Sequence, residues 1–244
     1  MPPSFDIRRH RRLGSTNDEA RRLALAGAPA GTVVTATEQT AGRGRQGRVW
    51  HSGAGNLHAS ILLRPDVPPA RLGELAFLAA LAVAETVDNL LAPARRVVLK
   101  WPNDVLVDGA KIAGILIEQE GTAMILGIGI NVAHHPPDTP YPATDLAAAM
   151  AGAGAIVAVE TVLQRLLAAL GTGLAMWDTH GFAPIRAAWL ARAQPSGTAL
   201  RVRLGAVGVP DTIEGHFAGL DARGALLLDT PAGQVRIVAG EVVR

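Results

Sequence analysis

Two lysines lie within one short stretch of a chain whose other strongly basic residues are all arginine. The chain has 21 arginines, and both of its lysines, Lys100 and Lys111, belong to the stretch KWPNDVLVDGAKIAGILIE at 100–118. An Asp-Gly pair stands between two alternating apolar segments, which predicts a β-hairpin. We expect Lys100 and Asp104 on the first arm and Lys111 at the start of the second. These charges could stabilise negative charge that develops on a reacting phosphate or carboxylate, although an ordinary surface hairpin with solvated charges is the alternative.

A second candidate for anion binding is the glycine- and arginine-rich loop QTAGRGRQGRVW at 39–50. Its glycines allow close backbone approach, and Arg43, Arg45 and Arg48 can each hold an anion through paired N–H groups. The loop formally matches the dinucleotide motif G-x-G-x-x-G, but that motif opens a helix, and the residues after the third glycine predict none. A small phosphorylated molecule is therefore the preferred ligand, and an RNA strand on an RGG-like loop is the alternative.

The composition predicts a globular chain with one large domain or a medium and a small one. The 244 residues are 49% hydrophobic and 18% charged, and they include no cysteine, which excludes disulfides and thiolate metal sites. No uninterrupted apolar run reaches the about 18 residues that a membrane span needs, and no secretory signal is evident at the start. We therefore expect a cytoplasmic protein. The N-terminal 60 residues carry nine arginines and four acidic residues, so any anion site should lie in the N-terminal part of the chain.

The patterns around these motifs predict an α+β protein with a small β-rich part at its C-terminal end. Thr16 and Glu19 fit a capping box at the start of the first helix. The glycines at 127 and 129 indicate a strand that is closely approached by another strand or by a ligand. We expect helices at 17–26, 69–91, 159–177 and 184–193, and strands at 32–38, 56–63, 95–99 and 123–130. Four further strands at 199–204, 212–220, 225–229 and 234–238 predict a small barrel, with domains at 1–193 and 194–244.

Four segments together resemble the biotin protein ligases. They are STN at 15–17, the arginine loop at 39–50, the lysine stretch at 100–118 and GIGIN at 127–131. The resemblance covers essentially the whole chain. It implies a mixed β-sheet flanked by helices, as in the catalytic domain of class II aminoacyl-tRNA synthetases and biotin and lipoate ligases, followed by a C-terminal SH3-like β-barrel. Because the first motif starts at Ser15, we expect the monofunctional type, without the N-terminal helix-turn-helix of the repressor members.

The resemblance implies a reaction in two steps. Biotin and ATP, with Mg²⁺, give biotinyl-5'-adenylate and pyrophosphate, and a lysine of a biotin carboxyl carrier domain then takes the biotin as an amide. Lys111 matches the family lysine that reaches the biotinyl carbonyl and phosphate. Arg45 matches the arginine that orders the loop over the adenylate and limits its escape. Asp104 matches a position where a carboxylate could hold the magnesium, orient the incoming lysine or accept its proton, and the sequence leaves these roles open.

The same resemblance implies the remaining contacts with the two substrates. The expected biotin contacts are Ser15, Thr16, Asn17, Gln39, Arg43 and Lys111. The expected ATP and adenylate contacts are Arg43, Arg45, Arg48, Trp50, Lys100, Asn103 and Asn131. This sequence departs from some relatives at Thr40, where they carry a second glutamine, and in the short proline-rich segment 133–143. These departures leave the behaviour of the loop that covers the adenylate open.

Two other functions compete with a biotin ligase. A lipoate or other acyl-adenylate ligase on the same fold would need a longer apolar tunnel, whereas the polar STN segment and Gln39 suit a ureido ring. A nucleic-acid-binding protein would use the arginine loop and the barrel, but 194–244 carries five basic and five acidic residues, which argues against phosphate binding there. We therefore expect no nucleic-acid or membrane partner, and either a monomer or a homodimer.

Overall fold

A mixed seven-stranded β-sheet forms the centre of the molecule. The computed structural model describes residues 4–150, 157–205 and 211–243. The strand order in the large sheet is β1-β2-β3-β7-β6-β5-β4, with β1 parallel to β2 and the other neighbours antiparallel. The strands are β1 (Asp6–Leu13), β2 (Thr32–Gln39), β3 (Leu57–Leu63), β4 (Val97–Lys100), β5 (Asp104–Val107), β6 (Ala110–Glu120) and β7 (Ala123–Ile130). The expected mixed sheet is confirmed.

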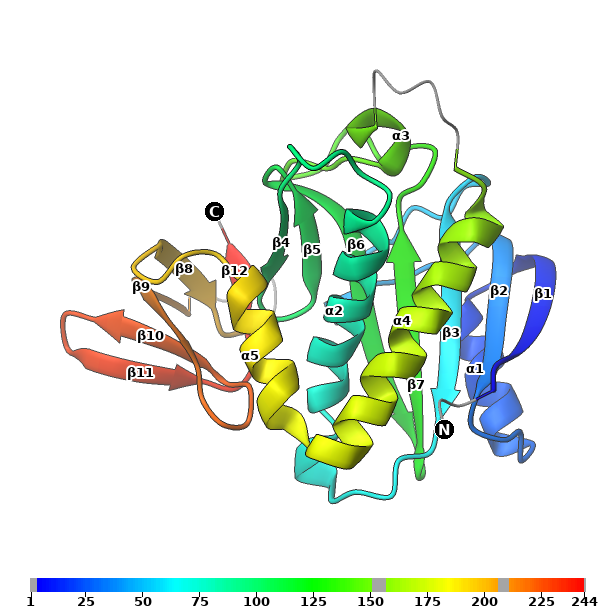
Figure 1. Cartoon of the computed structure of the whole chain (residues 1–244), viewed down its shortest axis with the longest axis horizontal. Helices are drawn as coiled ribbons and strands as arrows, with labels where there is room; N and C mark the ends of the chain where they lie inside the picture. Colours follow the sequence, from blue (N-terminus) through cyan, green and yellow to red (C-terminus); the bar gives the residue numbers. More distant parts are fainter. Residues whose placement is uncertain (1–3, 151–156, 206–210, 244) are drawn as a thin grey trace.

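Helices cover both faces of this sheet (Figure 1). On one face lie α2 (Glu74–Asp88), α4 (Val159–His180) and α5 (Phe182–Arg192), and on the other lies α1 (Thr16–Leu25). Most of α2 is buried, because it packs between the sheet and the other two helices, as its largely apolar sequence requires. The short elements are α3 (Leu146–Ala149) and the 3-10 turns η1 (Arg45–Gly47) and η2 (Pro69–Arg71). None of the helices in the described ranges is long and apolar enough to cross a membrane.

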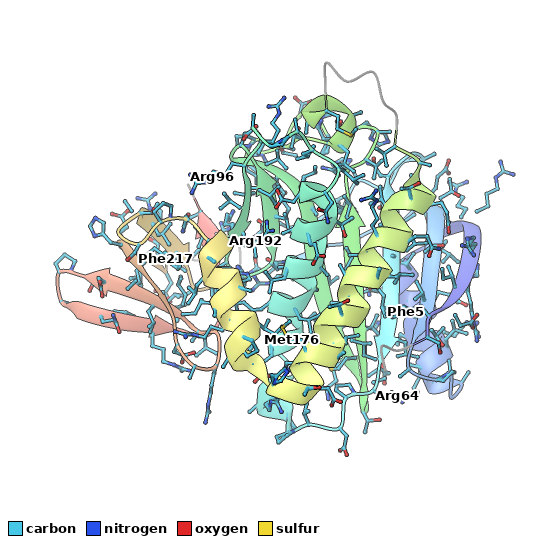
Figure 2. All side chains as sticks on the ribbon, in the orientation of Figure 1. Phe5, Arg64, Arg96, Met176, Arg192 and Phe217 are labelled. Carbon is cyan, nitrogen blue, oxygen red and sulfur yellow. The ribbon has the colours of Figure 1, made fainter. Side chains whose placement is uncertain are left out.

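Contacts between the helices fix α5 against α2. The Phe77 ring of α2 meets the rings of Phe182 and Trp189 edge-on, at centroid distances of 5.4 and 5.5 Å. At the other end of the pair, Arg192 Nη1 lies 2.7 Å from Asp88 Oδ2 (Figure 2). The side chains of α2, α4 and the sheet form one continuous hydrophobic core on this face.

The opposite face of the sheet, which α1 covers, is hollow at its centre. Successive residues of a strand face opposite sides, and on β7 the larger side chains of Met124, Leu126 and Ile128 join the main core. The residues that alternate with them include Gly127 and Gly129, which leave no side chain on the α1 face. The sheet therefore has room on that face for groups from other segments.

A second, five-stranded antiparallel sheet follows α5, in the order β11-β10-β9-β8-β12. Its strands are β8 (Ala199–Arg203), β9 (Thr212–Leu220), β10 (Leu226–Thr230), β11 (Gly233–Ile237) and β12 (Glu241–Val243). The four strands predicted from the sequence are present, and β12 was missed because its three residues are too short to show a pattern. The predicted boundary lies in the connection between α5 and β8, and the division into domains 1–193 and 194–244 stays a prediction.

The structure corrects three details of the expected elements. The first arm of the lysine hairpin consists of two strands, because Lys100 ends β4, Asp104 begins β5 and the two residues pair across a turn. The capping box at Thr16 is wrong: Ser15 is the residue before the helix, and the Thr16 hydroxyl donates to Gln39 instead. The helix expected at 69–91 is divided into η2 and α2.

The second sheet is attached to the first by polar groups as well as by apolar packing. Trp101 Nε1 donates to the Gly224 carbonyl oxygen at 3.2 Å, and Arg186 Nε donates to the Leu220 carbonyl oxygen at 3.0 Å. Glu241, on β12, accepts hydrogen bonds from Arg203 of β8 and from Arg48 of the arginine loop. One carboxylate therefore links the last strand of the second sheet to the arginine loop.

We predict that this link makes the stability of the fold depend on pH in the acid range. Burial disfavours the charged form of Glu241, but the hydrogen bonds from Arg48 and Arg203 outweigh it and lower the pKa from 4.5 to about 2. A group with a depressed folded-state pKa contributes stability above its unfolded pKa and loses it as the pH falls through its folded pKa. Glu241→Gln should therefore be less stable at pH 7 and should lose less stability than the unsubstituted chain between pH 4.5 and 2.

Urea unfolding at a series of pH values measures this difference. The control is Glu214→Gln, because Glu214 forms an exposed ion pair with Arg201 on the same sheet. Parallel curves of unfolding free energy against pH for Glu241→Gln and the unsubstituted chain would contradict the prediction.

Candidate active site

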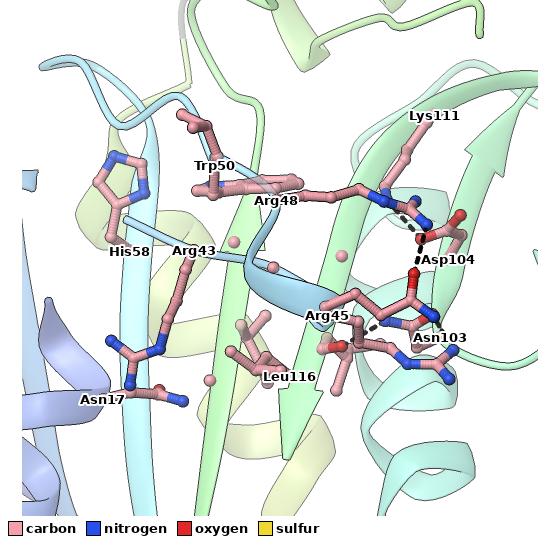
Figure 3. Close-up of a pocket in the computed structure, with 18 of the residues that line it drawn as sticks. Asn17, Arg43, Arg45, Arg48, Trp50, His58, Asn103, Asp104, Lys111 and Leu116 are labelled. Atoms are coloured by element: carbon pink, nitrogen blue, oxygen red, sulfur yellow. Dashed lines mark hydrogen bonds and ion pairs between the residues drawn. The ribbon is translucent and has the colours of Figure 1, made fainter. Parts of the chain in front are cut away.

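A pocket lies on the hollow face of the large sheet, between α1, the arginine loop and the β4–β6 strands (Figure 3). Asn17 and Arg43 lie at one end of it, and Lys111, Asp104 and Arg45 lie at the other. Twelve residues predicted from the sequence are among those that line it: Ser15, Thr16, Asn17, Gln39, Arg43, Arg45, Arg48, Trp50, Lys100, Asn103, Asp104 and Lys111.

Asn131 is the predicted site residue that does not line this pocket. Its Nδ2 donates to the Thr144 carbonyl oxygen at 2.9 Å, and its side chain is buried. It lines an adjoining cavity, which shares Arg48, Trp50 and Lys111 with the first pocket. The two spaces therefore meet around the Trp50 ring and the Lys111 ammonium group.

Amides and hydroxyl groups form the first end of the pocket, where α1 begins. The Thr16 backbone N–H donates to Gln39 Oε1 at 2.8 Å, and Gln39 Nε2 donates to Ser52 Oγ at 2.8 Å. Ser60 Oγ, on β3, donates to Asn17 Oδ1 at 2.6 Å and lies 2.8 Å from Thr16 Oγ1. Uncharged donors and acceptors are thus concentrated here, in a setting where an unpaired polar group would be costly.

The three arginines of the loop have different partners. Arg43 donates to Asp18 at 2.7 and 2.9 Å and to Glu118 at 3.0 Å, and these contacts raise the pKa of Arg43. Both terminal nitrogens of Arg48 donate hydrogen bonds to the Glu241 carboxylate.

Arg45 differs from both, because none of the described carboxylates lies within ion-pair distance of it. Its Nη1 lies 3.4 Å from Asn103 Oδ1, and burial lowers the pKa of Arg45. A half-buried guanidinium without an anionic partner is well suited to receive one from a ligand.

The two lysines share one carboxylate at the second end of the pocket. Lys111 Nζ lies 2.5 Å from Asp104 Oδ1, and Lys100 Nζ lies 3.4 Å from Asp104 Oδ2. The Lys111 ammonium group also lies 5.7 Å from the centroid of the Trp50 ring and 5.3 Å from that of Tyr141. Such cation–π contacts and the carboxylate hold Lys111 in a defined position. Since two ammonium groups share one carboxylate, this end of the pocket carries excess positive charge.

The Trp50 ring lies directly on the sheet. A Cβ atom at Gly129 would be 2.4 Å from Trp50 Cε2, and one at Gly114 would be 3.1 Å from Trp50 Cζ3. Asn17 approaches the sheet in the same way at Gly127, where a Cβ atom would lie 2.4 Å from Asn17 Oδ1. The close approach predicted at Gly127 and Gly129 is therefore made by side chains of this chain. Trp50 Nε1 is buried and has no hydrogen-bond partner among the described residues.

Several residues of the site were missed from the sequence. His58 and Ser60 pair with Gly129 and Gly127 across β3 and β7, and both are polar residues in a fully buried strand, which was an available signal. Burial lowers the pKa of His58, whose Nε2 lies 3.3 Å from the Gly53 carbonyl oxygen. Tyr141 and Glu241 reach the site only through tertiary contacts, for which the local pattern gives no signal.

Comparisons with known proteins agree with this architecture. Residues 10–133 match the Biotin/lipoate A/B protein ligase family, and residues 206–244 match the Biotin protein ligase C terminal domain. A Biotin--[acetyl-CoA-carboxylase] ligase from Paracoccus denitrificans is 42% identical over 240 residues, which are 95% of this chain and 97% of the relative. A Bifunctional ligase/repressor BirA from Bacillus subtilis is 38% identical, over 96% of this chain and 72% of the relative.

Solved structures support the same grouping. The biotin protein ligase from Aquifex aeolicus, in complex with biotin and ATP, has a TM-score of 0.84 and 29% identity, and the match covers 98% of this chain and 97% of that one. The match extends over both sheets. The chain therefore belongs to the biotin protein ligase family.

Proposed function

We propose that this protein is an ATP-dependent biotin protein ligase. The observation that carries the proposal is the division of one pocket into two ends: a polar end, where Arg43 is paired with Asp18 and Glu118, and an end with excess positive charge. Biotin has a ureido ring at one end and a carboxylate at the other, so it fits this division in one orientation. The Aquifex aeolicus relative, which was solved with biotin and ATP, supports the same pair of substrates.

The ureido ring would lie at the polar end. Its carbonyl oxygen and two N–H groups need partners when they are buried, and Ser15, Thr16 and Gln39 supply donors and acceptors there. Asn17 and Arg43 complete this end, and Glu118 holds both side chains. A lipoyl or octanoyl chain has no ureido group to match these donors and acceptors, which favours biotin over other acids.

The first chemical step would take place at the cationic end. A carboxylate oxygen of biotin attacks the α-phosphorus of ATP, the bond to the β-phosphate breaks, and pyrophosphate leaves with the bonding electrons. Two anions must approach each other, so fixed positive charge lowers the barrier. Lys111, Lys100 and Arg45 provide that charge in the proposal, and Asp104 keeps Lys111 aimed at the reacting atoms.

In the second step an amine of the acceptor protein attacks the biotinyl carbonyl carbon. An amide bond forms, the bond to the phosphate oxygen breaks, AMP leaves and the amine loses a proton. Asp104 is positioned among the lysines to orient that amine or to accept the proton. The name of the Paracoccus denitrificans relative suggests a carboxylase as acceptor, and we propose its biotin carboxyl carrier domain.

The remaining predicted residues would hold the nucleotide. Arg48, Trp50 and Asn103 border the cationic end, and Asn131 lines the adjoining cavity, where we place the adenosine part. Mg²⁺ would neutralise the triphosphate, and Asp104 is the carboxylate proposed to hold it. An ion bound mainly through phosphates needs only one or two protein carboxylates. A cytoplasmic location and a monomeric or homodimeric state stay predictions.

Exchange of labelled pyrophosphate into ATP tests the proposed function directly. We expect exchange that depends on biotin and on Mg²⁺. Exchange that depends on lipoate or octanoate, and not on biotin, would contradict the proposal in favour of another acyl-adenylate ligase. Salt-dependent binding to unrelated nucleic acid without any exchange would favour the nucleic-acid-binding alternative.

Lys111→Ala should slow adenylate formation by a factor of about 100 or more, because an oriented charge at the reacting atoms is lost. The assay is the single-turnover rate of biotinyl-adenylate formation at saturating biotin and ATP. Arg201→Ala is the control, because Arg201 is an exposed cation on β8. A rate for Lys111→Ala within a factor of three of the unsubstituted chain would argue against this role.

Arg45→Ala should release the adenylate before transfer, since Arg45 is the half-buried loop arginine without a carboxylate partner among the described residues. Free biotinyl-adenylate reacts with any accessible amine, so the variant should biotinylate an unrelated protein such as serum albumin. Filtration measures the released adenylate, and mass spectrometry measures the labelled lysines. If Arg45→Ala forms adenylate and retains it as fully as the unsubstituted chain does, the assignment is wrong.

A further inference from the structure

Glu118 lies behind the polar end of the pocket, on β6. It is not among the residues that line the pocket, yet its carboxylate touches two that do. Glu118 Oε2 accepts from Asn17 Nδ2 at 2.8 Å and from Arg43 Nη2 at 3.0 Å. Arg21 Nη2 lies 3.4 Å away, and the Glu118 side chain is 21% exposed. One carboxylate thus connects α1, the arginine loop and β6 beneath the polar end.

The carboxylate determines the orientation of the Asn17 amide. An ionised carboxylate only accepts hydrogen bonds, so Asn17 must turn its Nδ2 toward Glu118. This turns Asn17 Oδ1 toward Ser60, whose hydroxyl donates to it at 2.6 Å. Ser60 Oγ also lies 2.8 Å from Thr16 Oγ1, but the Thr16 hydroxyl donates to Gln39, so the order set by Glu118 ends at Ser60. Glu118 therefore fixes the donor and acceptor directions of the Asn17 amide and the Ser60 hydroxyl.

The same carboxylate also holds the arginine loop in place, through its contacts with Arg43. Arg43 Nη2 donates to both oxygens of Glu118, at 3.1 and 3.0 Å, and Arg43 Nε lies 3.4 Å from Oε1. Asp18 also binds Arg43, at 2.7 Å, but its side chain is 51% exposed and neither Asn17 nor Ser60 is its partner. Asp18 therefore binds Arg43, as Glu118 does, but it does not bind the Asn17 amide. This difference makes Asp18 a matched control for Glu118.

We propose that Glu118 is a positioning residue for recognition of the ureido ring. It presets the hydrogen-bonding pattern of Asn17 and Ser60, and it shares the anchoring of Arg43 with Asp18. The proposal rests on the proposed function, because it assigns the polar end to biotin. Pre-set donors and acceptors reject a ligand whose groups do not match, so Glu118 should determine selectivity as well as affinity.

Glu118→Gln and Asp18→Asn, made in the full chain, separate these roles. In the pyrophosphate-exchange assay, Glu118→Gln should raise the KM for biotin about tenfold, which is the effect expected for the loss of a hydrogen bond to a charged group. The KM for ATP and kcat should stay within a factor of two. Asp18→Asn should change the KM for biotin by less than a factor of three. Glu118→Asp keeps the charge and should recover part of the affinity.

A selectivity measurement distinguishes positioning from general weakening of the fold. The competitor is biotin methylated on one ureido nitrogen, which lacks one N–H donor. Glu118→Gln should reduce the preference for biotin over this analogue, whereas Asp18→Asn should retain it. If Glu118→Gln does not fold, Glu118→Asp must show the same biotin-specific change at a smaller size.

Two results would overturn the proposal on its own: unchanged biotin KM and selectivity in a folded Glu118 variant, or equal changes in the Glu118 and Asp18 variants. Absence of biotin-dependent exchange in the unsubstituted chain would overturn the proposed function and this proposal with it. Biotin-dependent exchange by the unsubstituted chain therefore shows whether the proposed function itself has failed or only the role of Glu118.

Discussion

The pocket depends on the absence of side chains at Gly127 and Gly129 of β7. A Cβ atom at either position would lie 2.4 Å from another side chain, Asn17 in the first case and Trp50 in the second, which is too close for real Cβ atoms. Asn17 can therefore lie directly on the backbone at Gly127, and Trp50 on the backbone at Gly129, both on the same face of the sheet. The polar end of the site forms around Asn17, and the space beside Lys111 forms around Trp50. The glycines thus make room for the side chains that form both ends of the pocket.

Two arginines of the arginine loop attach it to neighbouring elements, and the third is available to bind a ligand. Arg43 fastens the loop to α1 and β6 through Asp18 and Glu118, and Arg48 fastens it to the second sheet through Glu241. Arg45 lies between these two anchors and has no carboxylate partner among the described residues. An anchored loop loses less conformational entropy when a ligand binds, because its ends are already fixed. This division explains why three similar arginines in one motif are expected to respond differently to substitution.

Much of the fold followed from local patterns, and the remainder depends on contacts between distant segments. The alternating segments around Asp108-Gly109 predicted the hairpin, and the glycines at 127 and 129 predicted a close approach, because both signals are local. The groups that make the approach, Asn17 and Trp50, could not be predicted without the tertiary structure. The capping box failed for the same reason, since the hydroxyl of Thr16 bonds to Gln39, 23 positions away. The motifs placed most of the site, whereas Glu118 and Glu241 act through partners from other elements.

We expect this pocket to join biotin to AMP and to retain the product. The full chain can be incubated with biotin, ATP and Mg²⁺, and the protein fraction from gel filtration can then be examined by mass spectrometry. We expect biotinyl-5'-adenylate to elute with the protein at close to one molecule per chain. Recovery of the protein without any adenylate, or with an adenylate of lipoate or octanoate in a mixture of the three acids, would contradict it.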